Sequence, residues 1–552
     1  METNAKDADT ESTQAPAGST ISPANWLRFF IPTVCDLVFI LLLIGLSWGP
    51  LAKGLLGDAG IGWHIRTGHL ILGTHSIPRL DPFSSTMHGK TWYAWEWLYD
   101  AGVGAIHRAA GLNGVVFFSA LLIALTFVLV LRMMLARGVN LPVAVILLLL
   151  GVSASTIHFF ARPHVLSWLF TLIWFGLLER FEGGGKTRCL LWLPVLTLLW
   201  VNLHGGFVVG FILLAIYFVS ALVTRLVPRS EQDRGPAFVQ MQALGVAGIL
   251  AFAATFANPY GYKLHIHIYQ YLTDRFLMDH IDEFLSPNFH GLAQKCFAGL
   301  VLLAMVAVAA ARKRVGLSHL LVMLFAIYAG LYAARNIPVS SMLLVLIVGQ
   351  QTSGWLQEMA GSREVAERIR RLTARLDSFG TRMSRLDSSL RGHLWPFLVV
   401  ILALWICGNG GRLGSTRVLD ARFDDARFPT QATDRLERNG NREAVFCPDK
   451  WGGYLIYRLY PQTLVAVDDR HDLYGAEFLK RYLKIVRGEP GWRDSLEDMN
   501  AGWVLVPVNS PVSSLLEETD RWTAAYRDDT SVLYRHGEGA DRTDGRGRPL
   551  LH

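Results

Sequence analysis

The chain has 552 residues, of which 51% are hydrophobic, and its 52 Lys and Arg against 45 Asp and Glu give a formal net charge of +7. Apolar runs long enough to cross a bilayer recur along it, which excludes an ordinary soluble enzyme. The excess of positive charge lies in short basic loops between these runs, so it does not imply a nucleic-acid partner.

The first 25 residues, 1–25, are rich in Ser, Thr, Ala and Pro, with no basic segment leading into a short cleavable core. We interpret them as a disordered cytoplasmic tail rather than a signal peptide. The apolar runs that follow predict a polytopic α-helical membrane domain over 26–413, with about eleven transmembrane helices. The expected spans are 31–52, 114–135, 141–158, 164–180, 189–203, 206–224, 241–258, 293–311, 317–334, 337–352 and 394–413.

Basic residues recur in every second connection between these spans when residue 1 is placed in the cytoplasm. They are Arg132, Arg137, Arg180, Lys186, Arg188, Arg225, Arg229, Arg234, Arg312, Lys313 and Arg314. The positive-inside rule therefore predicts a cytoplasmic N-terminus and, with an odd number of spans, an outer C-terminus. The segment 354–393 interleaves arginines with carboxylates, as expected of a cytoplasmic helix beside anionic lipid headgroups.

The longest outer loop, 53–113, lies between the first two spans and carries three candidate carboxylates. Asp58 follows the first span closely, where it can face a substrate carried by the membrane, while a loop-stabilising ion pair with Arg66 is the structural alternative. Asp81 precedes a proline, which favours a turn-forming role. Glu96 stands among tryptophans that include Trp92 and Trp95, and this aromatic segment favours a helix lying in the headgroup plane.

Further polar residues lie in the shorter outer loops. Arg162 and His164 separate the third and fourth spans, His204 the fifth and sixth, and Arg335 the ninth and tenth. Charges at this depth are unfavourable unless paired or hydrated, which makes them functional candidates, although snorkelling arginines and packed histidines remain the alternatives.

The outer loop 258–292 holds Lys263, His265 and His267, followed by the carboxylate pair Asp282 and Glu283. A His-x-His pattern with two acids can bind a divalent metal, but its spacing is unspecific and a hydrogen-bonded lid is the favoured interpretation. No resident metal or other cofactor is predicted.

After the last span, 414–540 alternates strand-like with helical patterns and predicts a small extracytoplasmic α/β domain, followed by a flexible tail at 541–552. The strand-like pieces are EAVFCP, YLIYRLY, TLVAVD, GWVLVPV and SVLYRH, and helices are expected near 475–487 and 511–519. The run Asp468-Asp469-Arg470-His471 either contacts a substrate or forms ion pairs within the domain. Neither GxGxxG nor GxxxxGK[ST] occurs where a nucleotide would need it, which disfavours nucleotide-linked substrates.

A long first outer loop with an acidic residue just after the first span, an interfacial helix and many further spans together resemble the GT-C superfamily of integral-membrane glycosyltransferases. The segments GWHIRTGHLIL…IPRLDPFSSTMHGKTWYAWEWL and WGGYLIYRLYPQTLVAVDDRHDLYG are also similar to bacterial membrane proteins described as glycosyltransferase-like. The adjacent acidic pair common in GT-C first loops is absent, because Ala59 follows Asp58.

The resemblance implies transfer of a sugar from a polyprenyl-phosphate-linked donor to an extracytoplasmic glycan, lipid or protein acceptor. It places the chain among the lipids of a bacterial inner membrane, with the C-terminal domain in the periplasm. Asp58 would be the base or would orient the acceptor, with Asp81 and Glu96 as the other catalytic carboxylates. The expected substrate-binding residues are His64, Arg66, Trp92, Trp95, Arg162, His164, His204, Lys263, His265 and Arg335.

Two other functions remain open at this stage. A transporter or flippase of a lipid-linked glycan would also carry hydrated cations, but it predicts inverted repeats and charges near the middle of the bilayer. A non-catalytic protein of envelope-polysaccharide assembly would tolerate the loss of Asp58.

Overall fold

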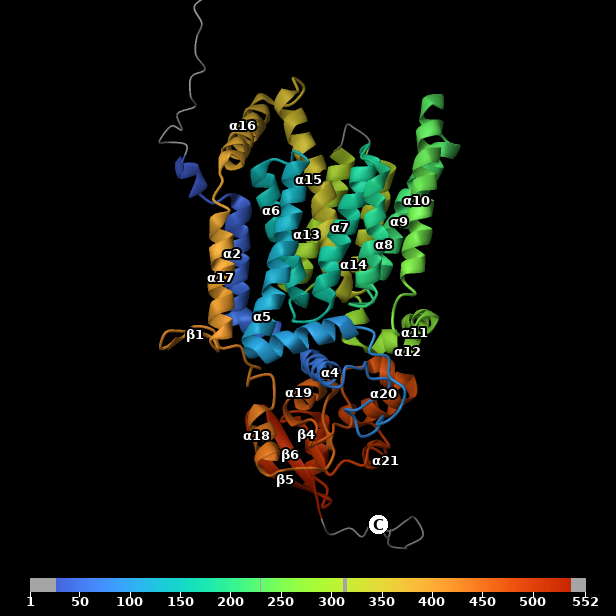
Figure 1. Ribbon diagram of the computed structural model, residues 1–552, viewed down its shortest axis with the longest axis vertical. Coiled ribbons are helices and arrows are strands. Elements are labelled where there is room, and N and C mark those ends of the chain that lie inside the picture. Colours follow the sequence, from blue (N-terminus) through green and yellow to red (C-terminus); the bar gives the residue numbers. More distant parts are fainter. Residues whose placement is uncertain (1–25, 229, 311–314, 538–552) are drawn as a thin grey trace, which may run out of the picture.

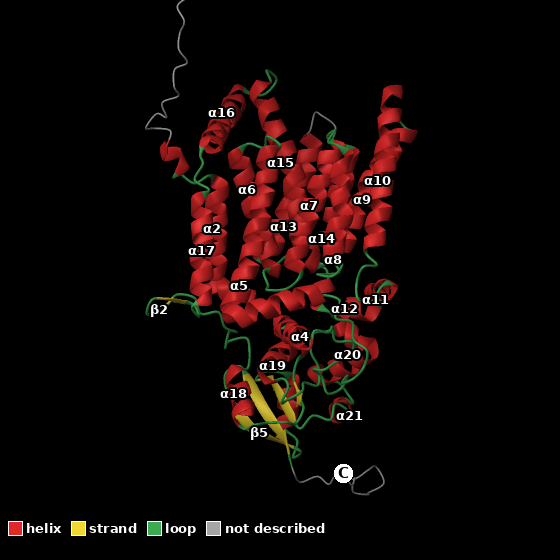
Figure 2. Ribbon diagram, viewed as in Figure 1, coloured by secondary structure: helices red, strands yellow, loops and turns green. Residues whose placement is uncertain are grey.

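The computed structural model describes residues 26–228, 230–310 and 315–537. The predicted tails at 1–25 and 541–552 lie outside these residues, as do Arg229, Arg312, Lys313 and Arg314. Figure 1 shows a bundle of long helices with a smaller domain beyond one of its ends. In the described part of the chain every strand follows the last helix of the bundle, as Figure 2 shows.

Long apolar helices form the bundle. Its elements are η1 (Leu27–Phe29), α2 (Val34–Ser47), α5 (Trp97–Ala136), α6 (Leu141–Ser155), η2 (Thr156–His158), α7 (His164–Glu182), η3 (Thr187–Leu191), α8 (Trp192–Trp200), α9 (Phe207–Leu226), η4 (Glu231–Asp233), α10 (Arg234–Ala254), α13 (Leu292–Ala310), α14 (Leu317–Tyr332), η6 (Ala334–Asn336), α15 (Ile337–Gly361), α16 (Glu367–Ser389) and α17 (Leu394–Gly408). Most are apolar around much of their circumference, as helices in lipid must be because their backbone groups are satisfied internally.

Seven segments in the described ranges are long and apolar enough to cross a membrane, or eight when the bent pair of α16 and α17 is one span. The seven are η1 with α2, α5, α6 with η2, α9, η4 with α10, α13, and η6 with α15. Helices α7, α8 and α14 occupy the other predicted spans. The prediction of a multi-pass membrane protein is confirmed, whereas the number of eleven spans stays a prediction.

The two ends of the bundle differ in charge. The basic connection after α7 and the arginine-rich α16 lie at the end away from the smaller domain (Figure 1). This agrees with the expected separation of basic loops from the C-terminal domain. Which end faces the cytoplasm stays a prediction, and we name the ends inner and outer according to it.

The loop 53–113 folds into a layer across the outer end. It contains α3 (Pro50–Leu55), α4 (Gly60–Thr74) and the first part of α5, which turns sharply at Gly111 before entering the bundle. Gly111 has φ 59°, a left-handed conformation that glycine adopts without a steric penalty. The outer layer is completed by α11 (Tyr262–Thr273), α12 (Arg275–His280) and η5 (Asp282–Phe284).

A short hairpin of β1 (Arg412–Leu413) and β2 (Thr416–Arg417) follows α17. The residues beyond it form the smaller domain, which we call the outer domain. Its elements are α18 (Thr430–Arg438), β3 (Val445–Phe446), α19 (Asp449–Leu459), α20 (His471–Arg487), α21 (Trp492–Glu497), β4 (Trp503–Pro507), α22 (Pro511–Glu517), β5 (Trp522–Arg527) and β6 (Ser531–His536). The main sheet has the order β3-β4-β6-β5, in which only the β3 and β4 pair is parallel. The predicted α/β domain is therefore present.

Two predicted strands of this domain are wrong. YLIYRLY belongs to the helix α19, and TLVAVD forms only isolated bridges through Val465. The α19 segment shows no regular pattern of apolar and polar residues because it is buried on nearly all sides. A short apolar run of this kind does not distinguish a buried strand from a buried helix. Both predicted helices appear, as α20 and α22, whereas β5 was not expected.

Helix α19 packs directly on α4 and joins the outer domain to the first loop. A side chain at Gly62 would meet the carbonyl oxygen of Gly453 at 2.1 Å, so the two backbones touch there. Arg66 on α4 donates to the carbonyl oxygen of Tyr457, with its Nε at 2.8 Å. The outer domain is thus held against the loop that carries Asp58.

Candidate active site

A cavity of about 1040 Å³ lies between the bundle, the outer layer and the outer domain. Its lining includes eight of the predicted site residues: Asp58, Trp92, Trp95, Glu96, Arg162, His164, His204 and Arg335. These residues come from five separate segments of the chain, and the outer domain adds a sixth wall. We call this space the site cavity.

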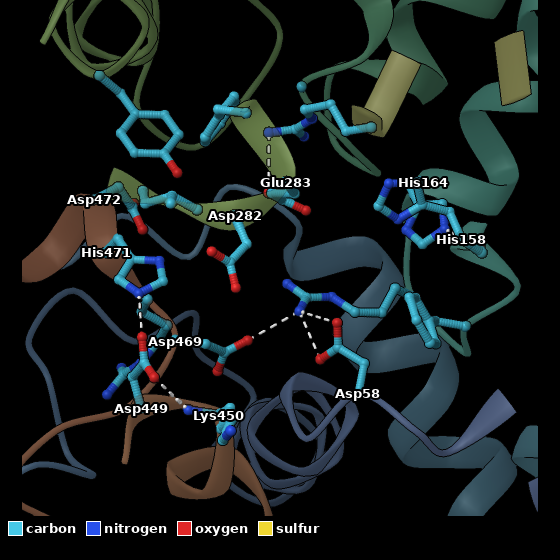
Figure 3. A pocket seen from close by; sticks show the side chains of 18 of the residues that line it. Asp58, His158, His164, Asp282, Glu283, Asp449, Lys450, Asp469, His471 and Asp472 are labelled. Atoms are coloured by element: carbon cyan, nitrogen blue, oxygen red, sulfur yellow. Dashed lines mark hydrogen bonds and ion pairs between the residues drawn. The ribbon is translucent and has the colours of Figure 1, made fainter. Parts of the chain in front are cut away.

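Arg162 is the central cation of the site cavity. Its Nη1 lies 2.9 and 3.0 Å from the two oxygens of Asp58 and 2.9 Å from Oδ2 of Asp469, and the dashed lines of Figure 3 mark these contacts. Gly60 permits the approach, because a side chain there would meet both Arg162 and Asp469 at 2.5 Å. The ion-pair partner of Asp58 is therefore Arg162, not the expected Arg66.

Asp469 ties the outer domain to this centre. Its second oxygen accepts a hydrogen bond from the indole of Trp63 at 3.0 Å. Burial raises the pKa of Asp469 to about 6; Arg162 opposes this shift and the nearby charge of Asp58 adds to it. Two carboxylates sharing one guanidinium leave the cluster with excess negative charge when both are ionised, so an added cation or proton is readily accommodated.

A second ion pair stands across the cavity. Nη1 of Arg335, in η6, lies 3.1 Å from Oε1 of Glu283 in η5, and its guanidinium rests over the ring of Phe284. Figure 3 shows Asp58, Asp282 and Glu283 around the same hollow, with His158 and His164 beside it. The cavity therefore offers two guanidinium groups and several carboxylates to one ligand.

Glu96 forms the deep end of the cavity. It precedes α5 and is 7% exposed, and burial raises its pKa to about 8, so the carboxyl is protonated at neutral pH. Nε2 of His204 lies 3.6 Å from Oε1 of Glu96, and Nε2 of His64 lies 3.8 Å from Oε2. His204 uses its Nδ1 to accept from the backbone N–H of Gly206, which leaves the Nε2 proton directed toward Glu96.

Behind Glu96 stands a completely buried pair. Nδ1 of His64 lies 2.6 Å from Oδ1 of Asp100, and both residues are 0% exposed. Among the described residues neither Nε2 of His64 nor Oδ2 of Asp100 has a hydrogen-bond partner. Burial lowers the pKa of His64 well below its usual range, so the imidazole is held neutral. His64 thus supports Glu96 from behind and does not line the cavity.

The outer domain contributes two further His–carboxylate pairs. Nε2 of His471 lies 2.9 Å from Oδ2 of Asp449, and Oδ1 of the same carboxylate accepts from the hydroxyl of Tyr482. Although burial opposes it, the bond to Asp449 raises the pKa of His471. Asp472 lies 2.9 Å from Nε2 of His267, a residue of α11. Both pairs line or border the cavity, so the outer domain is one wall of the site.

Asp81, predicted as one of three catalytic carboxylates, does not line the cavity with Asp58 and Glu96. It is 1% exposed and accepts from Nη1 of Arg470 at 2.7 Å and from the backbone of Ser84. Arg470 also binds Asp468 through Nε and Nη2 and lies over the ring of Trp92. This buried network fixes the first loop on the start of α20, so Asp81 supports the wall that carries Asp469.

Three predicted substrate-binding residues also lie elsewhere. Arg66 is used in the contact between α4 and α19, and Lys263 is exposed on α11. His265 bonds to Thr255 at 2.8 Å and stacks on Phe256. None of these three residues lines the site cavity, so the structure does not bring them together with Arg162 and Arg335.

Sequence reasoning did not single out Asp100, Asp449 and Lys450. Asp449 and Lys450 stand at the start of α19, between the two pieces EAVFCP and YLIYRLY that the sequence analysis predicted as strands. Asp100 lies in the first turn of α5, four residues after Glu96, and that helical spacing was the one signal that pointed to it. His158, which also lines the cavity, stands in no distinguishing sequence pattern.

Potential metal ligands gather at a different place. Within the described ranges, the group of His and carboxylate side chains close enough to share an ion is Glu179, Glu182 and His319, at the inner end of the bundle. The carboxylates of the site cavity are instead spread around Arg162 and Arg335. The absence of a resident metal stays a prediction.

The sequence matches no protein-family model, and no curated protein matches it. Among solved structures, it is similar to the oligosaccharyltransferase of Archaeoglobus fulgidus in the apo form, with a TM-score of 0.52, 11% identity, and coverage of 92% of this chain and 74% of that one. The chain is also similar to ArnT from Cupriavidus metallidurans bound to undecaprenyl phosphate, with a TM-score of 0.47 and 13% identity. That match covers 94% of this chain and 99% of ArnT.

The arabinofuranosyltransferase AftD from mycobacteria gives a TM-score of 0.46 and 13% identity, covering 93% of this chain and 40% of that one. The chain shares the fold of the Archaeoglobus fulgidus oligosaccharyltransferase, in agreement with the fold expected from the sequence, and at 11% identity this likeness establishes the fold alone.

Proposed function

We propose that this protein is a membrane glycosyltransferase that moves a sugar from a polyprenyl-phosphate-linked donor to an acceptor hydroxyl at the outer face of a bacterial inner membrane. One observation carries the proposal: Asp58 and Asp469 share Arg162 at a large cavity between the membrane helices and the outer domain. The same fold in an oligosaccharyltransferase supports it.

The walls of the cavity match a ligand with an apolar tail and an anionic head. On the membrane side the lining includes Trp168 of α7, Val208 and Val209 of α9, and Val339 of α15. Guanidinium groups stand farther out and can bind phosphate oxygens in pairs. A polyprenyl phosphate entering from the bilayer would therefore meet hydrocarbon first and cations next.

In the proposed reaction the acceptor oxygen bonds to the anomeric carbon as the bond from that carbon to the donor phosphate breaks. The hydroxyl proton passes to Asp58, and polyprenyl phosphate leaves. Arg162 connects the two events, because turning toward the phosphate withdraws it from Asp58. Asp58 is then free to accept the hydroxyl proton when the donor is in place.

Glu96 is proposed to act in its protonated form. A neutral carboxyl can donate a hydrogen bond to a substrate oxygen, and the burial that raises the pKa of Glu96 keeps that proton in place at neutral pH. His204 and His64 stand on either side and restrict the orientation of the group. Trp92 and Trp95 complete this part of the wall and would contact the acceptor.

Transport is less well supported. A flippase needs a polar path toward the opposite face, whereas the charged groups of the site cavity lie at the outer end. At the inner end of α7, Glu179 is occupied by Arg137 and His319. An assembly protein without catalysis makes no use of the contact between Arg162 and Asp58.

The test compares purified wild type with Asp58→Asn and with Asp279→Asn, whose carboxylate is exposed on α12 outside the cavity. Each protein receives radiolabelled polyprenyl-phosphate sugars and an acceptor fraction, both extracted from bacterial membranes. We expect Asp58→Asn to lose about 10²-fold or more of the transfer rate, as removal of a catalytic base does. Asp279→Asn should match the wild type.

Three outcomes decide the matter. Loss in Asp58→Asn alone, with an unchanged melting temperature, supports the transferase and its base. Equal transfer by all three proteins removes Asp58 from the mechanism. Transfer by none of them, although the same extracts support a known transferase, contradicts the proposed function.

A further inference from the structure

Helix α16, at the inner end of the bundle, has an apolar face that the protein leaves uncovered. Five of its large apolar residues repeat every three or four positions or at multiples of that spacing, so they share one side of the helix. They are Ile369 (47% exposed), Leu372 (58%), Leu376 (47%), Phe379 (44%) and Leu386 (55%). A continuous exposed apolar stripe of this kind marks an interaction surface.

The side of α16 next to the apolar stripe is fixed to the bundle through small residues. Thr373 and Gly380 are its buried positions, and a side chain at Gly380 would collide with Asn140 at the start of α6. Oδ1 of Asp387 accepts the backbone N–H of Val34 at 2.7 Å, which fastens the end of α16 to the start of α2. The apolar stripe cannot turn inward while these contacts hold.

The stripe borders an apolar groove of about 490 Å³. Its walls are the starts of α2 and α6 and the last turns of α16, and its lining is Pro32, Val34, Leu37, Leu141, Pro142, Val145, Ile146, Phe379, Met383, Leu386, Asp387 and Leu390. The groove lies where the membrane helices begin, so a hydrocarbon chain from the bilayer can reach it.

Exposed arginines accompany the stripe. Besides Arg371, which binds Glu367, they include Arg375, Arg382 and Arg385. Within the part of the chain that the structure describes, none of these three has an ion-pair partner. Arg382 and Arg385 lie in the same turns as Phe379, Met383 and Leu386, which wall the groove. Two guanidinium groups therefore stand one position from residues that wall the groove.

We propose that α16 lies in the inner headgroup layer and binds an anionic phospholipid, with an acyl chain in the groove and the headgroup phosphate held by Arg382 and Arg385. Arginine binds phosphate oxygens bidentately, and anionic lipids attract basic amphipathic helices. This site is at the opposite end of the bundle from the site cavity and is independent of the proposed glycosyl transfer.

Binding here should stabilise the pairing of α2 with α17. The backbone of Arg391 donates to the carbonyl of Arg28, and His393 lies 3.1 Å from Asp36, so the segment after α16 is tied to the start of the chain's first span. A ligand that holds α16 and α2 together binds the folded protein and not the unfolded chain. Its effect is therefore a higher melting temperature.

The experiment measures thermal unfolding of the full-length protein in neutral detergent with added phosphatidylglycerol, phosphatidylcholine or inorganic phosphate. We expect phosphatidylglycerol alone to raise the melting temperature, by about 2 °C or more at saturation. The double variant R382Q/R385Q should lose this increment. The control R438Q/R442Q removes two exposed arginines from the outer domain and should keep it.

An equal rise in melting temperature with both lipids, or with inorganic phosphate, would overturn the proposal. So would a rise with phosphatidylglycerol that persists in R382Q/R385Q or disappears in R438Q/R442Q. Native mass spectrometry of the wild type gives a measurement that does not depend on a variant folding. Retention of phosphatidylglycerol over phosphatidylcholine supports the site. Retention of neither, or of both equally, contradicts it. V145W, which fills the groove, should abolish that retention.

Discussion

Helix α7 carries an arginine–carboxylate cluster near each end, and the two clusters differ in what surrounds them. At the outer end, Arg162 holds Asp58 and Asp469 beside the site cavity. At the inner end, Glu179 is bound by Arg137 at 3.0 Å and His319 at 2.9 Å and accepts from the hydroxyl of Tyr217. The clusters are about 25 Å apart along the helix.

The inner cluster joins four helices, and its groups bind one another. Arg137 follows the end of α5, Glu179 is on α7, Tyr217 on α9 and His319 on α14. The outer cluster joins segments that meet around open space. An ion pair in the membrane domain is thus structural where packing encloses it and available for chemistry where a cavity adjoins it. The residue types alone do not distinguish the two cases.

Replacing the arginine of each cluster tests this difference most strongly. Arg162→Met should reduce glycosyl transfer by about 10²–10³-fold, because a preorganised positive charge for the leaving phosphate is lost. Arg137→Met should leave the transfer rate of the folded protein within about twofold and should instead lower the melting temperature, since it leaves Glu179 with fewer partners. Transfer assays and thermal unfolding of both variants measure the two effects.

Two results would contradict this comparison. Arg137→Met would abolish transfer without lowering the melting temperature, or Arg162→Met would lower the melting temperature without changing the transfer rate. Arg162→Lys is the matched control for charge. It keeps the cation but loses the flat fork that reaches two carboxylates, so intermediate activity is expected.

Asp469 tests whether the outer domain takes part in the chemistry. Asp469→Asn keeps the shape of the side chain and removes the second negative charge beside Arg162, so Arg162 should stay closer to Asp58. We expect a decrease of about tenfold in the transfer rate at pH 7. Asp425→Asn, in the same domain but outside the cavity lining, is the control and should have no effect. An unchanged transfer rate in Asp469→Asn would mean that the outer domain encloses the site cavity without taking part in the chemistry.

Glu96 gives the site a predicted pH dependence. With a pKa of about 8, its carboxyl is neutral below that pH and loses its proton above it, so transfer that needs the proton should fall through pH 8. Because the folded pKa is raised, the same group makes the protein progressively less stable from about pH 4.5 to 8, with no further change above. Glu96→Gln should remove both dependences and keep most activity at pH 7.

A profile of transfer rate against pH from 6 to 9.5, with wild type and Glu96→Gln in parallel, measures the predicted pH dependence. If the decline at alkaline pH persists unchanged in Glu96→Gln, another group causes the decline. Asp469, with its pKa of about 6, would not explain a transition near pH 8.

The membrane fold was predictable because lipid demands long apolar helices, and the expected spans coincide with helices of the bundle. Asp58, Glu96 and Arg162 were predictable from their places beside those spans. The sharing of Arg162 by Asp58 and Asp469 was not predictable, since the two carboxylates are separated by more than four hundred positions and no local pattern records their proximity. Asp449 was missed for a local reason, since the apolar segment after it was interpreted as a strand.

Replacing Lys263 has the smallest expected effect on the transfer rate. It tests most strictly whether a position on the wall of the site cavity decides which cations take part in the reaction. The sequence analysis placed both Lys263 and Arg335 among the expected substrate-binding residues. Arg335 lines the site cavity and pairs with Glu283, whereas Lys263 is exposed on α11. Lys263→Ala should therefore change the transfer rate by less than about twofold, while Arg335→Ala, assayed beside it, should weaken donor binding and raise its apparent KM by about tenfold. If the two variants lose activity equally, then charge near the outer surface, rather than a position on the cavity wall, decides which cations serve the reaction.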